Sequence, residues 1–293
     1  MRKFSRVALL VVLALAGQSK SLWAGPPLVN LEGVGGIAFN PLAYPADSAG
    51  EKTHLTSDKT DILGEPRFGS WYVNLHQSSI DWSSIGAADT FFHRLEVSYG
   101  YEAVAVAGFA SVHKHNLGAK LLLVPENAGG TKAVPAVSIG VVEKSASAII
   151  LNSKFDIGKA AFGGPDSKSS SPDFYLVATK LVTQTPRPVL LSAGALSTAG
   201  YATGVLGFDS KHKTVGFGNI DVVLPAGFAV GYEIQQGAKF SVYKNPTYWD
   251  AHLAWFATPN ITAVLAYVNA GDVKSTSVNG LGTGTVLSLQ HTF

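Results

Sequence analysis

Three polar residues at alternate positions have types that could do chemistry. Ser111, His113 and His115 would share one face of a strand, where a hydroxyl and a histidine base could meet. Nucleophilic catalysis also needs an orienting group and oxyanion donors, and the chain has no Gly-x-Ser-x-Gly motif. The two histidines could bind a metal, but zinc needs about four ligands and no cysteine or nearby carboxylate completes the set. We therefore expect no catalytic residue, no metal site and no cofactor.

Other polar residues recur on one side of alternating segments and could line the inside of a barrel. A charge that faces lipid near the bilayer midplane costs roughly 2–4 kcal/mol, so strand charges should point inward. The candidate lumen-lining residues are Arg94, Glu96, Ser98, Asn219, Asp221, Glu233, Ser288, Gln290 and Thr292. They could form an open polar pore or pair with one another in a filled interior. Because the signs are mixed, we expect no strong ion selectivity in either case.

Short segments of period two would position these side chains. The clearest are 94–101, 135–142, 189–197 and 228–235, with further candidates at 33–40, 68–76, 103–110, 115–124, 146–152, 173–183, 214–224, 248–257, 260–270 and 284–293. Charged residues make up 14% of the chain, against roughly 25% in average soluble domains. The sequence therefore predicts an all-β, antiparallel transmembrane β-barrel of about 12 strands, with roughly 10 and 14 as bounds. A secreted β-sandwich is the alternative.

Both ends of the chain indicate the outer membrane of a Gram-negative bacterium. Basic residues and an apolar run at 7–16 are typical of a signal peptide over residues 1–24, removed after Ala24. Residues 286–293 alternate and end on Phe293, as the closing strand of an outer-membrane barrel does, so Phe293 is the predicted assembly signal. His291 stands where such strands commonly carry an aromatic residue. No basic block suits nucleic acid.

The predicted organisation has three parts: the signal peptide, an N-terminal segment at 25–67 and the barrel at 68–293. The N-terminal segment could be a loop, a periplasmic lead or a plug. With a periplasmic C-terminus, long outer loops are predicted at 125–133, 153–172, 198–213, 236–247 and 271–283, and short periplasmic turns at 143–145, 184–187, 225–226 and 258–259. Predicted interfacial girdle residues are Trp71, Tyr72, Tyr248, Trp249, Trp255, Phe256 and Tyr267.

Four stretches carry a family resemblance. They are Asn30-Leu31-Glu32-Gly33-Val34-Gly35-Gly36, residues 173–180, residues 248–260 and Leu265-Ala266-Tyr267-Val268. Together they resemble an uncharacterised family of bacterial outer-membrane β-barrel proteins, a domain of unknown function. The resemblance covers most of the chain after the signal peptide and implies a barrel with nothing catalytic.

The leading predicted function is a passive or accessory channel for small solutes, gated by loop 153–172 or by the N-terminal segment. The alternative is a closed barrel that serves as a structural partner or as a partner in envelope or surface-polymer export. An outer-membrane lipid hydrolase that uses Ser111 and His113 is the third hypothesis. The expected partners are outer-membrane lipid, the outer-membrane assembly machinery and a small solute, without nucleic acid.

Overall fold

The computed structural model describes residues 28–46, 62–106, 110–150, 153–156 and 167–293. The predicted signal peptide and the middle of the predicted loop 153–172 lie outside these residues.

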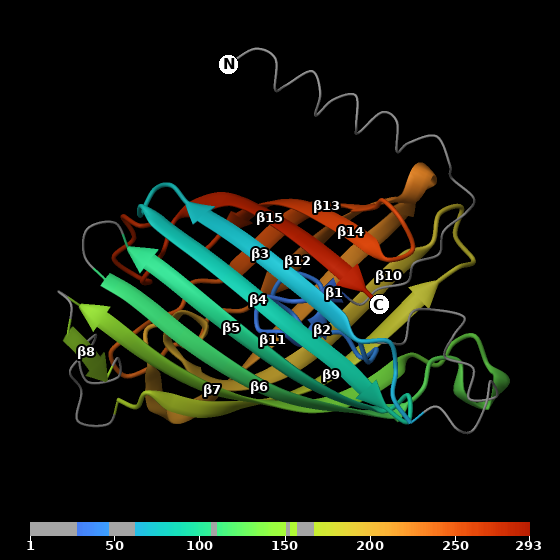
Figure 1. The fold of residues 1–293 in the computed structure, drawn as a ribbon, viewed down its shortest axis with the longest axis horizontal. Helices are drawn as coiled ribbons and strands as arrows, with labels where there is room; N and C mark the ends of the chain where they lie inside the picture. The colour runs from blue at the N-terminus through green and yellow to red at the C-terminus, as the bar shows by residue number, and fades with distance from the viewer. Residues whose placement is uncertain (1–27, 47–61, 107–109, 151–152, 157–166) are drawn as a thin grey trace, which may run out of the picture.

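A closed antiparallel barrel of 12 strands makes up most of the chain, and this confirms the predicted fold class (Figure 1). Its strands are β3 (Arg67–Leu75), β4 (Ile80–Phe91), β5 (Leu95–Val106), β6 (Ala110–Val124), β7 (Ala136–Ile150), β9 (Ser170–Val182), β10 (Val189–Gly200), β11 (Phe208–Leu224), β12 (Phe228–Gln235), β13 (Tyr248–Phe256), β14 (Ile261–Asn269) and β15 (Thr283–Thr292). Each strand pairs with the next barrel strand along the chain, and β15 closes the ring on β3. The short β8 (Ser153–Asp156) pairs with β7 alone.

A small two-stranded sheet, β1 (Leu28–Val29) with β2 (Gly35–Gly36), lies inside the ring of strands, where Figure 1 draws it in blue. Three 3-10 turns, η2 (Ala128–Gly130), η3 (Tyr201–Gly204) and η4 (Pro225–Gly227), connect strands at the ends of the barrel. No helix among the described residues is long and apolar enough to span a bilayer.

The two ends of the barrel differ in their connections. One end, here called the C-terminal rim, carries the end of β15 and the connections 92–94, 125–135, 183–188, 225–227 and 257–260. The other end, the loop rim, carries 76–79, 201–207, 236–247 and 270–282. The predicted turns at 184–187, 225–226 and 258–259 lie at the C-terminal rim as expected. The predicted long loops at 236–247 and 271–283 lie at the loop rim.

Two predictions about the middle of the chain are wrong. Residues 143–145 form no turn, because β7 runs unbroken from Ala136 to Ile150. The connection 125–133 consequently lies at the C-terminal rim and not among the outer loops. The break predicted between the segments 94–101 and 103–110 is also absent, because β5 continues to Val106.

The barrel wall is largely apolar outside, and its inner face combines buried charged and polar side chains with buried apolar ones. Exposed outward side chains include Ile85, Leu117, Leu176, Leu265, Leu287 and Leu289. Aromatic rings gather on the outer face near both rims, with Tyr232, Trp249 and Tyr267 in contact at one level, and Phe228 with Trp255 at another. Trp71 and Tyr248, predicted for a girdle, instead point inward and are buried. The Trp71 indole N–H donates to the carbonyl of Val29 at 2.7 Å, so an interior partner holds it there.

Candidate functional site

The barrel lumen is occupied by the chain's own N-terminal plug, defined as residues 28–46. Both of its ends lie near the C-terminal rim: Val29 N–H donates to Gln290 Oε1 at 3.0 Å, and the Tyr44 hydroxyl donates to Glu126 Oε2 at 2.9 Å. Between these points the plug rises towards the loop rim and turns back. The two ends of the plug therefore lie near the same opening of the barrel.

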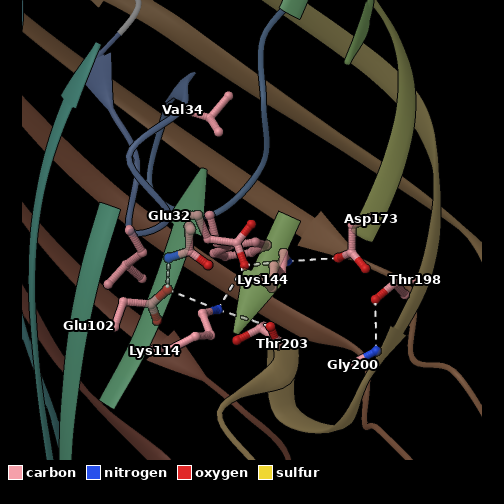
Figure 2. Close-up of polar contacts among 12 residues, drawn as sticks. Glu32, Val34, Glu102, Lys114, Lys144, Asp173, Thr198, Gly200 and Thr203 are labelled. Carbon is pink, nitrogen blue, oxygen red and sulfur yellow. Dashed lines mark hydrogen bonds and ion pairs between the residues drawn. The ribbon is translucent and has the colours of Figure 1, made fainter. Parts of the chain in front are cut away.

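One anchor of the plug is the Glu32 carboxylate, which lies between two buried lysines (Figure 2). Lys114 Nζ contacts Glu32 Oε1 at 3.0 Å, Glu102 Oε1 at 2.8 Å and the Thr203 carbonyl at 3.0 Å, so its three N–H donors are all used. Lys144 Nζ bonds Glu32 and also Asp173 Oδ2, the latter at 2.7 Å. Lys114 thus connects the plug, the wall and the turn η3.

A second anchor holds the plug nearer the C-terminal rim. Lys120 Nζ contacts Glu96 Oε2 at 2.8 Å and donates to the carbonyls of Gly35 and Tyr44, each at 2.8 Å. Glu96 Oε1 in turn accepts the Gly35 N–H at 2.9 Å. One wall ion pair thereby fixes two distant points of the plug.

The third anchor is on the opposite wall. The Glu233 carboxylate accepts three successive backbone N–H groups of the plug, from Ala38 at 2.9 Å, Phe39 at 3.1 Å and Asn40 at 3.2 Å. Glu233 is fully buried. All three anchors bind the plug through polar contacts, and apolar plug side chains such as Val34, Ile37 and Leu42 also pack against the wall.

Glycines allow the plug backbone to approach the wall. Gly33 has φ +86°, and a Cβ added there would lie 2.4 Å from the Tyr99 carbonyl oxygen. A Cβ added at Gly100 would lie 2.3 Å from the Glu32 carbonyl oxygen, and one at Gly86 would lie 2.6 Å from Gly33 Cα. Because these contacts are between backbones, a side chain has no room there.

The charges around Glu32, the carboxylate by which the plug is anchored, favour its ionised form. Burial opposes ionisation of the Glu32 carboxyl, but Lys114 and Lys144 outweigh it and lower the pKa of Glu32. At the C-terminal rim, burial and the nearby Glu126 carboxylate raise the pKa of Tyr44, so its hydroxyl keeps the proton that it donates.

The loop rim is closed by two inward-folded loops, 201–207 and 236–247. Asn245 joins them, because its side chain accepts the Ala202 N–H at 2.9 Å and donates to the Gly200 carbonyl at 3.0 Å. The Tyr201 ring packs against Phe240 and Tyr243 with centroids 5.5 and 5.6 Å apart. A cavity of about 50 Å³ lies between these loops and the plug. A cavity of this volume has room for a few waters.

Most of the residues predicted to line the lumen have buried, inward-facing side chains. They are Glu96, Ser98, Asn219, Asp221, Glu233, Ser288 and Gln290. Thr292 is half-buried at the end of β15. Arg94 is the exception, since β5 begins at Leu95 and Arg94 belongs to the turn at the C-terminal rim. Phe293 is exposed and packs edge-on against Phe68 and His291; its role as an assembly signal stays a prediction.

Sequence reasoning missed most of the charged residues that hold the plug. They are Glu32, Glu102, Lys114, Lys120, Lys144 and Asp173. Part of this set could have been predicted, because Lys114, Asn116 and Lys120 stand at even-numbered positions of β6 and therefore face the same side of the sheet.

The Ser111 cluster lies on the outer face of the wall. Ser111 Oγ is 3.1 Å from His113 Nε2, and His113 Nδ1 is hydrogen-bonded to the Tyr101 hydroxyl at 2.5 Å. His115 pairs in the same way with Tyr99. A nucleophile, a base and an orienting group are therefore aligned, but the backbone amides of β6 pair with β5 and β7 and none is free to stabilise an oxyanion at Ser111. Among the described residues no group of three potential ligands could hold a metal ion.

Removing one lysine of the plug anchor should destabilise the protein strongly. In Lys144→Met, Glu32 and Asp173 would keep their buried charges without this partner, which costs about 3–5 kcal/mol. We expect a clear fall in the temperature at which the folded barrel loses its compact gel mobility. Lys180→Met is the matched control, since its pair with Glu126 is partly exposed and worth at most about 1 kcal/mol. Equal shifts in both variants would contradict a buried anchor.

Comparisons with known proteins agree with this architecture. A family model described as "Protein of unknown function (DUF3034)" matches residues 29–290. Among solved structures, the KdgM porin is 12% identical with a TM-score of 0.50 and covers 78% of this chain and 99% of that chain. A KdgM porin in complex with disordered oligogalacturonate has 12% identity and a TM-score of 0.49, with the same coverage. A NanC porin structure has 10% identity, a TM-score of 0.46, and 78% and 98% coverage. None of the curated proteins compared matches the chain.

Proposed function

We propose that this chain, which belongs to the DUF3034 family of proteins of unknown function, is an outer-membrane β-barrel channel for small solutes that its own N-terminal plug holds closed. The observation that carries the proposal is the polarity of the interior. A barrel that served only as a scaffold could fill its lumen with apolar side chains alone, whereas this lumen also carries many buried charged and amide groups that water or a polar solute could contact once the plug leaves.

The exterior supports a membrane setting. Outward side chains form an apolar surface around the wall, with aromatic rings near the rims, as lipid-facing barrels have. In this proposal the C-terminal rim faces the periplasm, since its connections are the shorter ones, and the plug enters from that side. Outer-membrane lipid surrounds the wall, and the assembly machinery recognises the strand that ends on Phe293.

A closed barrel that acts as a structural or export partner is the second candidate. The observation in its favour is the small interior cavity of about 50 Å³, bounded by the plug and the two loops at the loop rim. The two functions differ in whether the plug ever leaves. Lipid hydrolysis is not part of the proposal, because the backbone amides of β6 around Ser111, among the described residues, are paired within the sheet.

The test is conductance of the purified full-length protein in planar bilayers, together with uptake of a small uncharged sugar by liposomes that carry it. A channel that is mostly closed should give discrete but infrequent openings and slow sugar uptake. Silence over all salts and voltages, in the wild type and in a variant whose plug is displaced, would leave the closed-barrel function.

A further inference from the structure

The two sides of the lumen carry different charge. On β5, β6, β7 and β9, each inward carboxylate has a lysine partner: Glu96 with Lys120, Glu102 with Lys114, and Asp173 with Lys144. Beside the plug lie the carboxylates of Asp221, Glu233 and Asp250 on β11–β13, with His252 as the one basic residue in this group, whereas Asp209 of β11 bonds Tyr201 and Ser241 at the loop rim. We call Asp221, Glu233, Asp250 and His252 the acidic wall. The signs that are mixed in the sequence are therefore separated in space.

Within the acidic wall, a histidine bridges two carboxylates. His252 Nε2 is 2.7 Å from Asp221 Oδ1, and His252 Nδ1 is 2.7 Å from Asp250 Oδ1. Gly231 lies between Asp221 and His252 in the sheet register and leaves room for this contact, since an added Cβ would lie 2.2 Å from Asp221 Oδ1. This arrangement fixes the side chain of Asp250 and leaves its second oxygen free.

Two observations indicate which kind of group the acidic wall can bind. Glu233, directly opposite Asp250 in the β12–β13 pairing, receives three converging N–H groups from plug residues 38–40. Asp250 Oδ2, in a side chain 1% exposed, is buried and has no hydrogen-bond partner among the described residues. When the plug leaves, Glu233 loses its three donors beside an Asp250 oxygen that already lacks one, and buried charges of one sign without compensation are costly. A cation would replace what the plug supplies.

We infer that the acidic wall is the cation-binding and selectivity site of the open channel, and that the plug amides occupy the place of a solute's ammonium group. A primary ammonium has three N–H donors, which is the number that Glu233 accepts from the plug. Asp250 Oδ2 can accept a further donor of the same solute. This inference rests on the proposed channel function and adds its substrate class, small polar solutes that carry an amine.

The first test measures ion selectivity in a full-length variant with a displaced plug. Gly33→Val serves for this, because a Cβ at position 33 would lie 2.4 Å from the wall carbonyl of Tyr99. In a KCl gradient its reversal potential should show preference for K⁺ over Cl⁻. Adding Glu233→Gln or Asp250→Asn should remove most of that preference. Glu143→Gln, which removes an exposed carboxylate from the outer face of β7, is the matched control and should leave it unchanged.

The second test measures binding without conductance. Ethylammonium titrated into the Gly33→Val protein in detergent should release heat, and Glu233→Gln in that background should weaken binding at least about tenfold, or about 1.4 kcal/mol. If Gly33→Val conducts but prefers anions, or if neither substitution changes selectivity and ethylammonium does not bind, the cation site is overturned while the channel stands. If Gly33→Val does not conduct, the channel function fails, and the titration alone decides the cation site.

Discussion

Replacing Gly33 with valine is expected to expel the plug and to raise the open probability of the barrel at least about tenfold. Two effects act on the same residue. Its φ of +86° is a conformation that β-branched residues avoid, and the left-handed region costs L-residues about 1–2 kcal/mol. The new Cβ would also meet the Tyr99 carbonyl oxygen at 2.4 Å, where backbone faces backbone and no side chain can turn away. A tenfold change needs only about 1.4 kcal/mol.

The measurement combines planar-bilayer recording with limited proteolysis, because the two report different steps. Proteolysis should cut residues 28–46 in Gly33→Val and spare them in the wild type if the plug has left the lumen. Gly216→Val is the matched control: it adds the same side chain to a glycine whose added Cβ meets nothing nearer than Gln236 Oε1, at 3.9 Å. A cleaved plug without added conductance would show that the barrel stays closed by the loops at the loop rim, and would leave the closed-barrel function.

One of the two loops at the loop rim, 201–207, is coupled to the plug through a lysine. Lys114 Nζ binds Glu32 of the plug and the carbonyl of Thr203 in the inward-folded loop 201–207. Ala202 and Thr203 have positive φ values of 47° and 60°, so this turn holds a conformation that non-glycine residues rarely adopt. Loss of Glu32 would leave Lys114 bound to Glu102 and Thr203, so the contact that joins the plug to this turn would be lost while the turn keeps its contact with the wall lysine.

Local pattern was sufficient to predict the barrel but not its contents. Alternating apolar residues in segments such as 228–235 and 284–293 mark strands that face lipid on one side, and these are β12 and β15. In β6, His113-Lys114-His115-Asn116 is polar on both faces, so it has no apolar alternation and resembles a turn. The structure accounts for both faces: Lys114 and Asn116 are buried in the lumen, and the two histidines bond tyrosines outside.

Contacts between distant segments limit how much of the candidate site can be predicted from the sequence. Lys144 stands in a polar stretch that suggests a turn, and its partner Glu32 is 112 residues away in the chain. Trp71 resembles a girdle residue until Val29 is placed beside it in the lumen. The sequence also left open whether the N-terminal segment is a loop, a lead or a plug, because a segment bound through backbone amides and glycines has little side-chain signature of its own.

A disulfide between plug and wall should abolish every opening of the channel, and reduction should restore them. The chain has no cysteine, so an engineered pair has no competitor. Val34 and Gly118 suit the pair, since a Cβ added at Gly118 would lie 3.2 Å from Val34 Cγ2. A Cβ and the opposite sulfur are about 3 Å apart at standard S–S length. Ser98 Oγ would crowd the new side chain, but it has no hydrogen-bond partner, so Ser98→Ala makes room without losing a bond.

The locked protein is therefore Val34→Cys with Gly118→Cys in the Ser98→Ala background, and the two single-cysteine proteins in that background are its controls. Under oxidising conditions the double variant should show no conductance and no sugar uptake, whereas both controls should behave as the wild type does. Adding dithiothreitol should return the double variant to wild-type openings, because only the tether distinguishes it. Openings that persist in the oxidised protein would mean that solute passes while residue 34 stays at the wall, and that the plug is a fixed part of the barrel.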